Sequence, residues 1–279
     1  MRRTLAAFAA IIAAGSLAAC GSTPPTAATT PSPSATPSES ASACSPTAMT
    51  CGGPSATPPP AKATHLLPGA LATFTELPAA TFNAIGRGTA IPDYDPQPID
   101  TAALTQDGKP RVLYVGAEWC PYCAGERWAL ALALGRFGTF TDLGQVRSAK
   151  NDGNVASISF HGSTYTSDYL ALGSFEVEDR DYQPLDLLSP ADGELFKTVG
   201  QSGYPFIDLG GKYMVNASYD ISVLLGLNQA QIVGALKDPR SPVTQAVVGA
   251  ANVLTARLCE LTHDQPAAVC TAAAVTSLR

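Results

Sequence analysis

The sequence predicts an α/β fold built on one central sheet. Three observations predict it: an apolar strand over residues 111–116 that runs into a helix, an alternating strand over 155–160, and a late hairpin over 205–216. This order of strand, crossover helix, strands and hairpin is typical of a sheet with helices packed on its faces. The 279 residues suffice for one large domain with appendages.

Two cysteines stand where the first strand meets its helix. Residues 124–134 are rich in helix formers, so Cys120 and Cys123 open the helix. Pro121 suits the first turn, where the N–H that proline lacks has no intrahelical partner. Unpaired N–H groups and the positive end of the helix dipole favour thiolate over thiol. The pattern indicates thiol–disulfide exchange, in which an ionised and accessible Cys120 attacks and Cys123 resolves the mixed disulfide.

The other elements follow from caps, turns and periodicity. Gly210-Gly211 forms the turn of the hairpin, and Ser189 is the expected N-cap of a helix. The expected elements are a helix over 78–86, a turn-rich segment over 91–109, a connection over 137–140, a strand over 169–178, and helices over 190–199, 228–236 and 241–261.

The first residues read as an export signal. Arg2 and Arg3 precede an apolar run over 5–17, and Leu-Ala-Ala-Cys ends at Cys20. This tetrad resembles a bacterial lipobox, which implies that residues 1–19 are a lipoprotein signal peptide and that Cys20 is lipidated. A plain signal peptide with a chance cysteine is the alternative. The expected location is the extracytoplasmic face of the bacterial cell membrane, by a lipid anchor.

Residues 20–64 consist almost entirely of Ser, Thr, Pro, Ala and Gly, a composition typical of a disordered tether. Cys44 and Cys51 interrupt it and either close a small loop or are unpaired. Residues 65–279 form the expected folded domain.

The number of cysteines and the net charge limit the classes of function that this chain can have. Of seven cysteines, six remain after Cys20, which suggests three local pairs in an exported chain. Cys259 and Cys270 would form a structural disulfide, with a second redox pair as the alternative. Without Arg2 and Arg3, 15 basic residues face 23 acidic ones, a net charge of −8 that argues against a nucleic-acid partner.

A lone Cys-x-x-Cys is used for redox chemistry, for metal binding or as an inert disulfide. Structural zinc takes four Cys or His ligands. The nearest candidates, Cys259, His263 and Cys270, lie more than 130 residues away, and His65 and His161 have no ligand-like spacing. We therefore expect redox use, no metal, and no cofactor besides the Cys120–Cys123 disulfide itself.

Residues 115–123 (Val-Gly-Ala-Glu-Trp-Cys-Pro-Tyr-Cys) resemble the active-site strand and turn of the thioredoxin superfamily. The resemblance implies a thioredoxin-like fold and a cis-proline opposite the cysteines. Pro205, before a β-prone run and 82 residues after Cys123, matches that proline; an ordinary strand-start proline is the alternative. By the resemblance, Pro205 joins the two cysteines in catalysis, and the residues that position the substrate are Trp119, Pro121, Tyr122 and Tyr204.

More narrowly, residues 120–130 and 134–140 are similar to a family known only as domain of unknown function 929, found in archaea and actinobacteria. The similarity extends over most of residues 75–275. This implies the fold, with an insertion between the Cys-x-x-Cys helix and the cis-proline strand and extra C-terminal helices, and it leaves the activity open.

One departure from thioredoxin bears on mechanism. Tyr114 stands six positions before Cys120, where thioredoxins carry a buried acid that helps to move a proton from the second thiol. Glu118 and Glu126 lie nearby and are the candidate replacements, although a solvated flank and a helix-surface charge are their ordinary roles.

The sequence thus favours a membrane-anchored, extracytoplasmic thiol–disulfide oxidoreductase, with oxidation or isomerisation favoured over reduction. Its partners would be protein thiol or disulfide clients and a membrane redox partner. The alternative is a non-enzymatic cell-envelope binding or assembly lipoprotein, in which the Cys120–Cys123 bond is structural.

Overall fold

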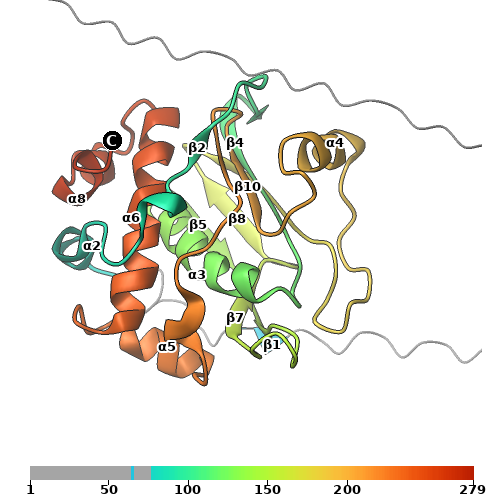
Figure 1. The fold of residues 1–279 in the computed structure, drawn as a ribbon. Helices are drawn as coiled ribbons and strands as arrows, with labels where there is room; N and C mark the ends of the chain where they lie inside the picture. Colours follow the sequence, from blue (N-terminus) through green and yellow to red (C-terminus); the bar gives the residue numbers. More distant parts are fainter. Residues whose placement is uncertain (1–63, 66–76) are drawn as a thin grey trace, which may run out of the picture. The chain divides into compact units, whose positions relative to one another are not determined.

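The computed structural model describes residues 64–65 and 77–279, and these form a central mixed sheet flanked by helices, the fold class that the sequence predicts (Figure 1). This architecture is compatible with a thioredoxin-like fold. Cys20, Cys44 and Cys51 lie outside the described residues, so the signal peptide, the lipid anchor and the tether stay predictions.

Strand β4, Lys109–Gly116, lies at the centre of the sheet. Strand β10, Phe206–Leu209, pairs with it antiparallel, and β9, Ala171–Glu176, pairs with it parallel, with Gly116 opposite Glu176. The sheet is completed by β11 (Tyr213–Val215), β2 (Gln97–Pro98) and β3 (Thr105–Gln106).

The side chains of β4 alternate between two apolar layers, as the pleat requires. Val112 and Tyr114 belong to the larger layer, whereas Leu113 and Val115 belong to the layer that contains Phe196. Helices α3 (Pro121–Gly135) and α6 (Pro242–Leu261) lie together on one side of the sheet, and α4 (Pro190–Thr198) lies on the other (Figure 1).

The caps explain where several helices begin. Ser189 accepts a hydrogen bond from the backbone N–H of Asp192 and caps α4 as predicted, and Asn228 with Gln231 forms a capping box on the next helix. The remaining helical elements are α2 (Ala79–Ile85), α5 (Gln229–Ala235), α7 (Ala267–Cys270), α8 (Ala273–Thr276) and two 3₁₀ turns (Pro92–Tyr94 and Ile221–Leu224).

Two small sheets follow α3. In one, β5 (Gly138–Thr141) pairs with β8 (Thr164–Ser167); in the other, β6 (Gly144–Arg147) pairs with β1 (Thr64–His65) and β7 (Ala156–Ser159). The prediction of a connection over residues 137–140 is therefore wrong for residues 138–140, which belong to β5. Phe140 forms a cross-strand aromatic pair with Tyr165, with ring centroids 4.8 Å apart, and this pairing makes the segment a strand.

The strand predicted over residues 169–178 is present. Within it, β9 is a strand of the central sheet, where it pairs with β4.

The C-terminal segment is held by the predicted disulfide. Cys259 in α6 is bonded to Cys270 in α7, with their Cα atoms 5.5 Å apart. The long helix α6 is buried along most of its length. Among the described residues, no helix has the length and apolar character that a membrane span requires.

Candidate active site at the start of helix α3

Cys120 is the N-cap of α3, and Cys123 lies in the first turn. The backbone of Cys120 is extended, and its Sγ accepts a hydrogen bond from the N–H of Cys123 at 3.1 Å. Pro121 occupies the first helical position, as predicted. Both cysteines are free thiols. The thiol pair therefore meets the unpaired N–H groups of a helix N-terminus.

The two thiols differ in acidity. Hydrogen bonding from Cys123 lowers the pKa of Cys120, with help from the N–H of Tyr122 and the positive charge of Arg127, although burial opposes the shift. Burial raises the pKa of Cys123 well above its ordinary value, and the hydrogen bond to Cys120 adds to the rise. Cys120 is thus the better nucleophile, and Cys123 retains its proton.

The Cys120 sulfur is covered, contrary to the accessibility expected from the sequence. The residue is only 3% exposed and forms a buried cluster with Ala117 and Cys123. The side chains that pack over this cluster are those of Trp119, Val177 and Tyr204. Cys120 is therefore accessible to a molecule from solvent only if part of this cover moves.

Trp119 is the best-anchored part of the cover. Its indole Nε1–H donates to Glu178 Oε2 at 2.7 Å, and its ring stacks on Tyr182 at a centroid distance of 5.2 Å. The ring of Tyr204 meets it edge-on at 5.9 Å. Trp119 is therefore held from two directions.

Glu178 and Tyr182 belong to residues 177–186, which we call the cover hairpin. Leu185 N–H donates to the carbonyl of Val177, and the strand pairing of β4 with β9 continues where Glu118 N–H donates to the carbonyl of Glu178. The sheet therefore extends past the ends of both strands and carries the cover hairpin to the thiols. This hairpin was not predicted.

Tyr204 packs against the thiol cluster together with Trp119 and Val177, and Pro205 follows it in the chain. The Tyr204–Pro205 peptide bond is cis, as the resemblance implied, and Gln265–Pro266 is a second cis bond that the sequence analysis did not predict. Phe206 pairs with Val115 near the end of β4, so Pro205 stands at the edge of the sheet where the chain turns toward Cys120. Tyr122, between the cysteines, is 56% exposed.

The two candidate acids are not where their ordinary roles would place them. Glu126 is wholly buried because α3 is enclosed on every side, and the hydroxyl of Tyr94 donates to it at 2.8 Å. Burial raises the pKa of Glu126 well above its usual range. Glu118 is half-buried and accepts a hydrogen bond from Ser159 at 2.6 Å. The predictions of a helix-surface charge and a solvated flank were thus wrong for Glu126 and only partly right for Glu118.

The charged pair nearest the thiols was not predicted. Arg127 and Glu176 are both 0% exposed, and Nη1 of the arginine lies 2.8 Å from Oε2 of the glutamate. A sequence signal for Arg127 existed, since it stands one helical turn after Cys123, next to Glu126, in a helix that is otherwise apolar over residues 124–134. Glu176 gave no such signal.

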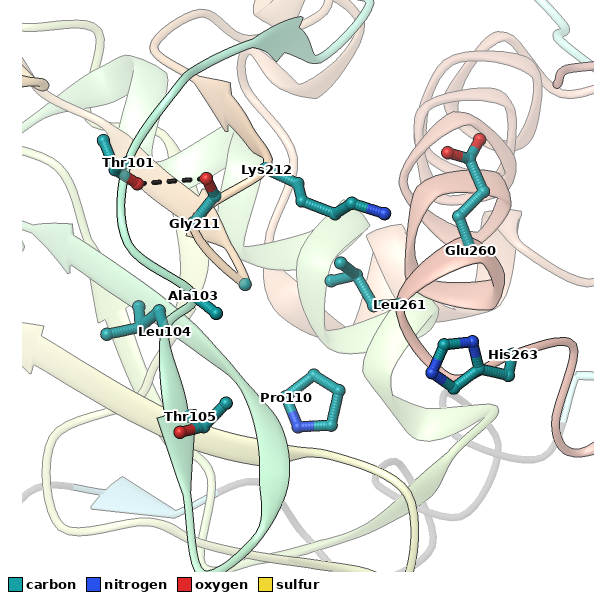
Figure 2. Close-up of a pocket in the computed structure, with 11 residues that line it drawn as sticks. Thr101, Ala103, Leu104, Thr105, Pro110, Gly211, Lys212, Glu260, Leu261 and His263 are labelled. Carbon is teal, nitrogen blue, oxygen red and sulfur yellow. Dashed lines mark hydrogen bonds between the residues drawn. The ribbon is translucent and has the colours of Figure 1, made fainter.

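A pocket of about 260 Å³ lies away from the thiols, at the other end of β4 (Figure 2). Pro110, at the start of β4, lines it together with Lys212, Glu260 and His263, and Thr101 donates a hydrogen bond to Gly211 at its rim. The disulfide partner Cys259 is next to Glu260 in sequence. The second cysteine pair is therefore not brought together with Cys120, which argues against a direct relay between them.

The histidines do not form a site with the thiols. His161 lies in a turn with its Nδ1 2.7 Å from Asp186, His263 is exposed, and only the backbone of His65 is described. Within the part of the chain that the structure describes, no three His, Cys, Asp or Glu side chains are grouped to hold a metal ion.

Residues 96–201 match the family model described as Domain of unknown function (DUF929). The match bears out the expected resemblance to this family, over a shorter stretch than the expected 75–275. No curated protein and no solved structure matches the chain. The DUF929 match includes both cysteines of the thiol pair and all of the cover hairpin, and it ends before Pro205.

Loosening the cover should make Cys120 more reactive. We expect Tyr182→Ala to raise the alkylation rate of reduced Cys120 several-fold, because the stacked ring that holds Trp119 over the buried cluster is removed. The measurement is iodoacetamide labelling over time, with mass spectrometry to locate the label. Leu187→Ala is the control, since Leu187 is 87% exposed beside the cover hairpin and should leave the rate unchanged. Equal rates in both variants would mean that Tyr182 does not limit access.

Proposed function

We propose that this protein is a thiol–disulfide oxidoreductase that acts through Cys120 and Cys123. The observation that carries the proposal is the asymmetry of the pair at the helix N-terminus: Cys120 Sγ accepts the Cys123 N–H, and its pKa is lowered while that of Cys123 is raised. One thiolate nucleophile beside one protonated resolving thiol is what exchange chemistry requires.

The oxidising direction runs in two steps. A client thiolate attacks Cys120 Sγ, which breaks the Cys120–Cys123 bond and forms a mixed disulfide, and Cys123 leaves and takes up a proton. A second client thiolate then attacks the client sulfur of the mixed disulfide and releases Cys120 as a thiolate. Two electrons pass from client to protein, and the client gains one disulfide. A membrane redox partner of disulfide or quinone chemistry would reoxidise the pair.

The surroundings of the thiols fit a protein client. Tyr122, between the cysteines, and Tyr182, stacked on Trp119, present half-exposed aromatic rings, so apolar client residues would find contacts near the thiols. Pro205 would place the Tyr204 backbone next to a bound client strand, and Pro121 would start the helix that presents Cys120. These roles follow from the resemblance and the placement together.

The predicted signal peptide and Cys20 lipid anchor would put this chemistry outside the cytoplasm, where disulfides persist. That compartment favours oxidation or isomerisation of client disulfides over their reduction. An extracytoplasmic, membrane-tethered enzyme is accordingly the full form of the proposal.

One observation favours the alternative of a binding or assembly lipoprotein with a structural Cys120–Cys123 bond, namely the 3% exposure of Cys120. The two functions differ in reactivity. A structural pair has no use for a nucleophilic thiolate, whereas an enzyme needs a Cys120 pKa well below the ordinary value of about 8.5.

We expect Cys123→Ser to accumulate mixed disulfides between Cys120 and client proteins, because the resolving thiol is gone. The experiment uses the full chain in its native host, with the complexes separated on non-reducing gels and identified by mass spectrometry. Cys120→Ser is the matched control and should trap none. If Cys123→Ser traps no more than this control and Cys120 resists alkylation after mild reduction, the binding function is favoured.

A further inference from the structure

Arg127 is joined directly to the turn that carries Cys120. It lies one helical turn beyond Cys123, on the same face of α3. Its Nη1 donates to the carbonyl of Ala117 at 3.3 Å, and the same carbonyl accepts the N–H of Cys120 at 3.1 Å. The guanidinium is thus a fixed positive charge behind the thiol pair.

Glu176 competes for that charge. Its Oε2 accepts from Arg127 Nη1 at 2.8 Å, and the same nitrogen lies 3.5 Å from the hydroxyl of Tyr114, while Ser157 accepts from Arg127 Nε at 3.0 Å. The register of β9 on β4 places Glu176 opposite Gly116, just before the active-site turn. A single cation therefore serves a buried carboxylate and a thiol pair at once.

The ion pair between Arg127 and Glu176 is not expected to contribute much to the stability of the fold. Both side chains are 0% exposed, and Arg127 Nη2 and Glu176 Oε1 each lack a hydrogen-bond partner. The desolvation of two such charges often exceeds their attraction, and apolar residues in their place are frequently no worse. The charge of the arginine also acts on the sulfurs, since its effect is to lower the pKa of both Cys120 and Cys123.

Burial also brings the titration of Glu176 into the physiological pH range. Burial raises the pKa of Glu176 to about 7, against the lowering effect of Arg127. Burial alone would lower the pKa of Arg127, but Glu176 and Tyr114 raise it, so the guanidinium keeps its charge. The titratable and charged groups that face the pair are Cys120 and Cys123 from α3, Tyr114 from β4, Glu118 from the turn, and Asp186, paired with His161, from the cover hairpin.

We propose that Arg127 and Glu176 are the positioning residues that set the reduction potential of the Cys120–Cys123 couple, Arg127 by stabilising the thiolate and Glu176 by competing with the thiolate for the same positive charge. This inference rests on the proposed function. Reduction by a client dithiol adds two electrons, leaves Cys120 as a thiolate, places one proton on Cys123 and releases one to solvent. Stabilising the thiolate favours the reduced form, which makes the disulfide a stronger oxidant.

The test is the equilibrium of each folded variant with reduced and oxidised glutathione, at about pH 6 and about pH 8, one unit either side of the Glu176 pKa. Glu176 ionises as the pH rises through about 7. At the higher pH, Glu176→Gln removes a full negative charge and should shift the equilibrium about tenfold toward the reduced form, or about 30 mV. At the lower pH it replaces a mostly neutral acid and should change the equilibrium little.

The double variant Arg127→Gln/Glu176→Gln should give the reverse pattern. At about pH 6 it removes an uncompensated positive charge and should shift the equilibrium several-fold toward the disulfide, and at about pH 8 it replaces a neutral pair and should change little. The pH at which the Cys120 thiolate forms, followed by its ultraviolet absorbance, should fall in Glu176→Gln and rise in the double variant.

Arg111→Gln/Asp192→Asn is the matched control. It removes another ion pair, 2.6 Å long, whose Asp192 lies in α4 on the other side of the sheet, and should leave both equilibria unchanged. Folded Arg127 and Glu176 variants with equilibria and thiolate titrations like the wild type would overturn the inference. If the wild-type pair does not exchange with glutathione at all, the proposed function itself fails.

Discussion

Cys120→Ser should reduce thiol–disulfide exchange to the rate measured without protein. The hydroxyl of serine does not ionise near neutral pH and forms no disulfide, so neither step of the exchange remains. The structure makes the loss specific, since Cys120 is the one of the two thiols whose pKa is lowered, and it occupies the N-cap position. The measurement is the oxidation of a reduced, unfolded client protein by the oxidised enzyme in a glutathione buffer.

Cys123→Ala is the informative companion in this assay. It keeps the nucleophile but cannot form the Cys120–Cys123 disulfide, so Cys120 should accumulate in mixed disulfides and the client should be oxidised more slowly than by the wild type. Residual turnover in Cys120→Ser, equal to that of the wild type, would place the reactive sulfur elsewhere. Client oxidation at the wild-type rate in both Cys120→Ser and Cys123→Ala would likewise place the reactive sulfur elsewhere.

Loss of the Cys259–Cys270 disulfide should have the largest effect on stability. The bond closes a loop with a sequence separation of 11, for which chain-entropy arguments give about 3 kcal/mol. Both cysteines are buried where α7 meets the end of α6, so the double variant Cys259→Ala/Cys270→Ala also loosens the last turns of the chain. Denaturant unfolding, compared with the wild type in the absence of reductant, measures the difference.

The variant Cys259→Ala/Cys270→Ala also tests whether the Cys259–Cys270 disulfide is structural or passes electrons to the thiol pair. Because this disulfide lies at the end of α6 beside the pocket and not at the thiol pair, exchange per folded molecule should be unchanged. A fall in turnover without a fall in stability would show that electrons pass through the second pair.

The sequence predicted those features that depend on local order. The buried strand, the proline at the first helical position and the cap at Cys120 are set by neighbouring residues, and the structure has each of them. The cis bond before Pro205 was reached only through the resemblance, since an X–Pro step alone rarely indicates it.

Features that depend on pairing distant segments could not be predicted. Glu126 was expected on a helix surface because charged helix residues usually lie there. Its burial and its bond to Tyr94, 32 residues earlier in the chain, depend on the fold. Glu176 faces Arg127 only through the parallel register of β9 on β4, which requires the fold. The cover over Cys120 has the same origin, since Tyr182 reaches Trp119 across more than 60 residues of chain.

The exchange reaction itself is tested most directly by mixing the protein in its Cys120–Cys123 disulfide form with a reduced client dithiol and quantifying both sulfur pairs over time. We expect one client disulfide for each Cys120–Cys123 bond that is reduced, with a rate that follows ionisation of the client thiol. A Cys120–Cys123 bond that persists unchanged in a client solution, while the chain stays folded, would contradict a redox role for this pair.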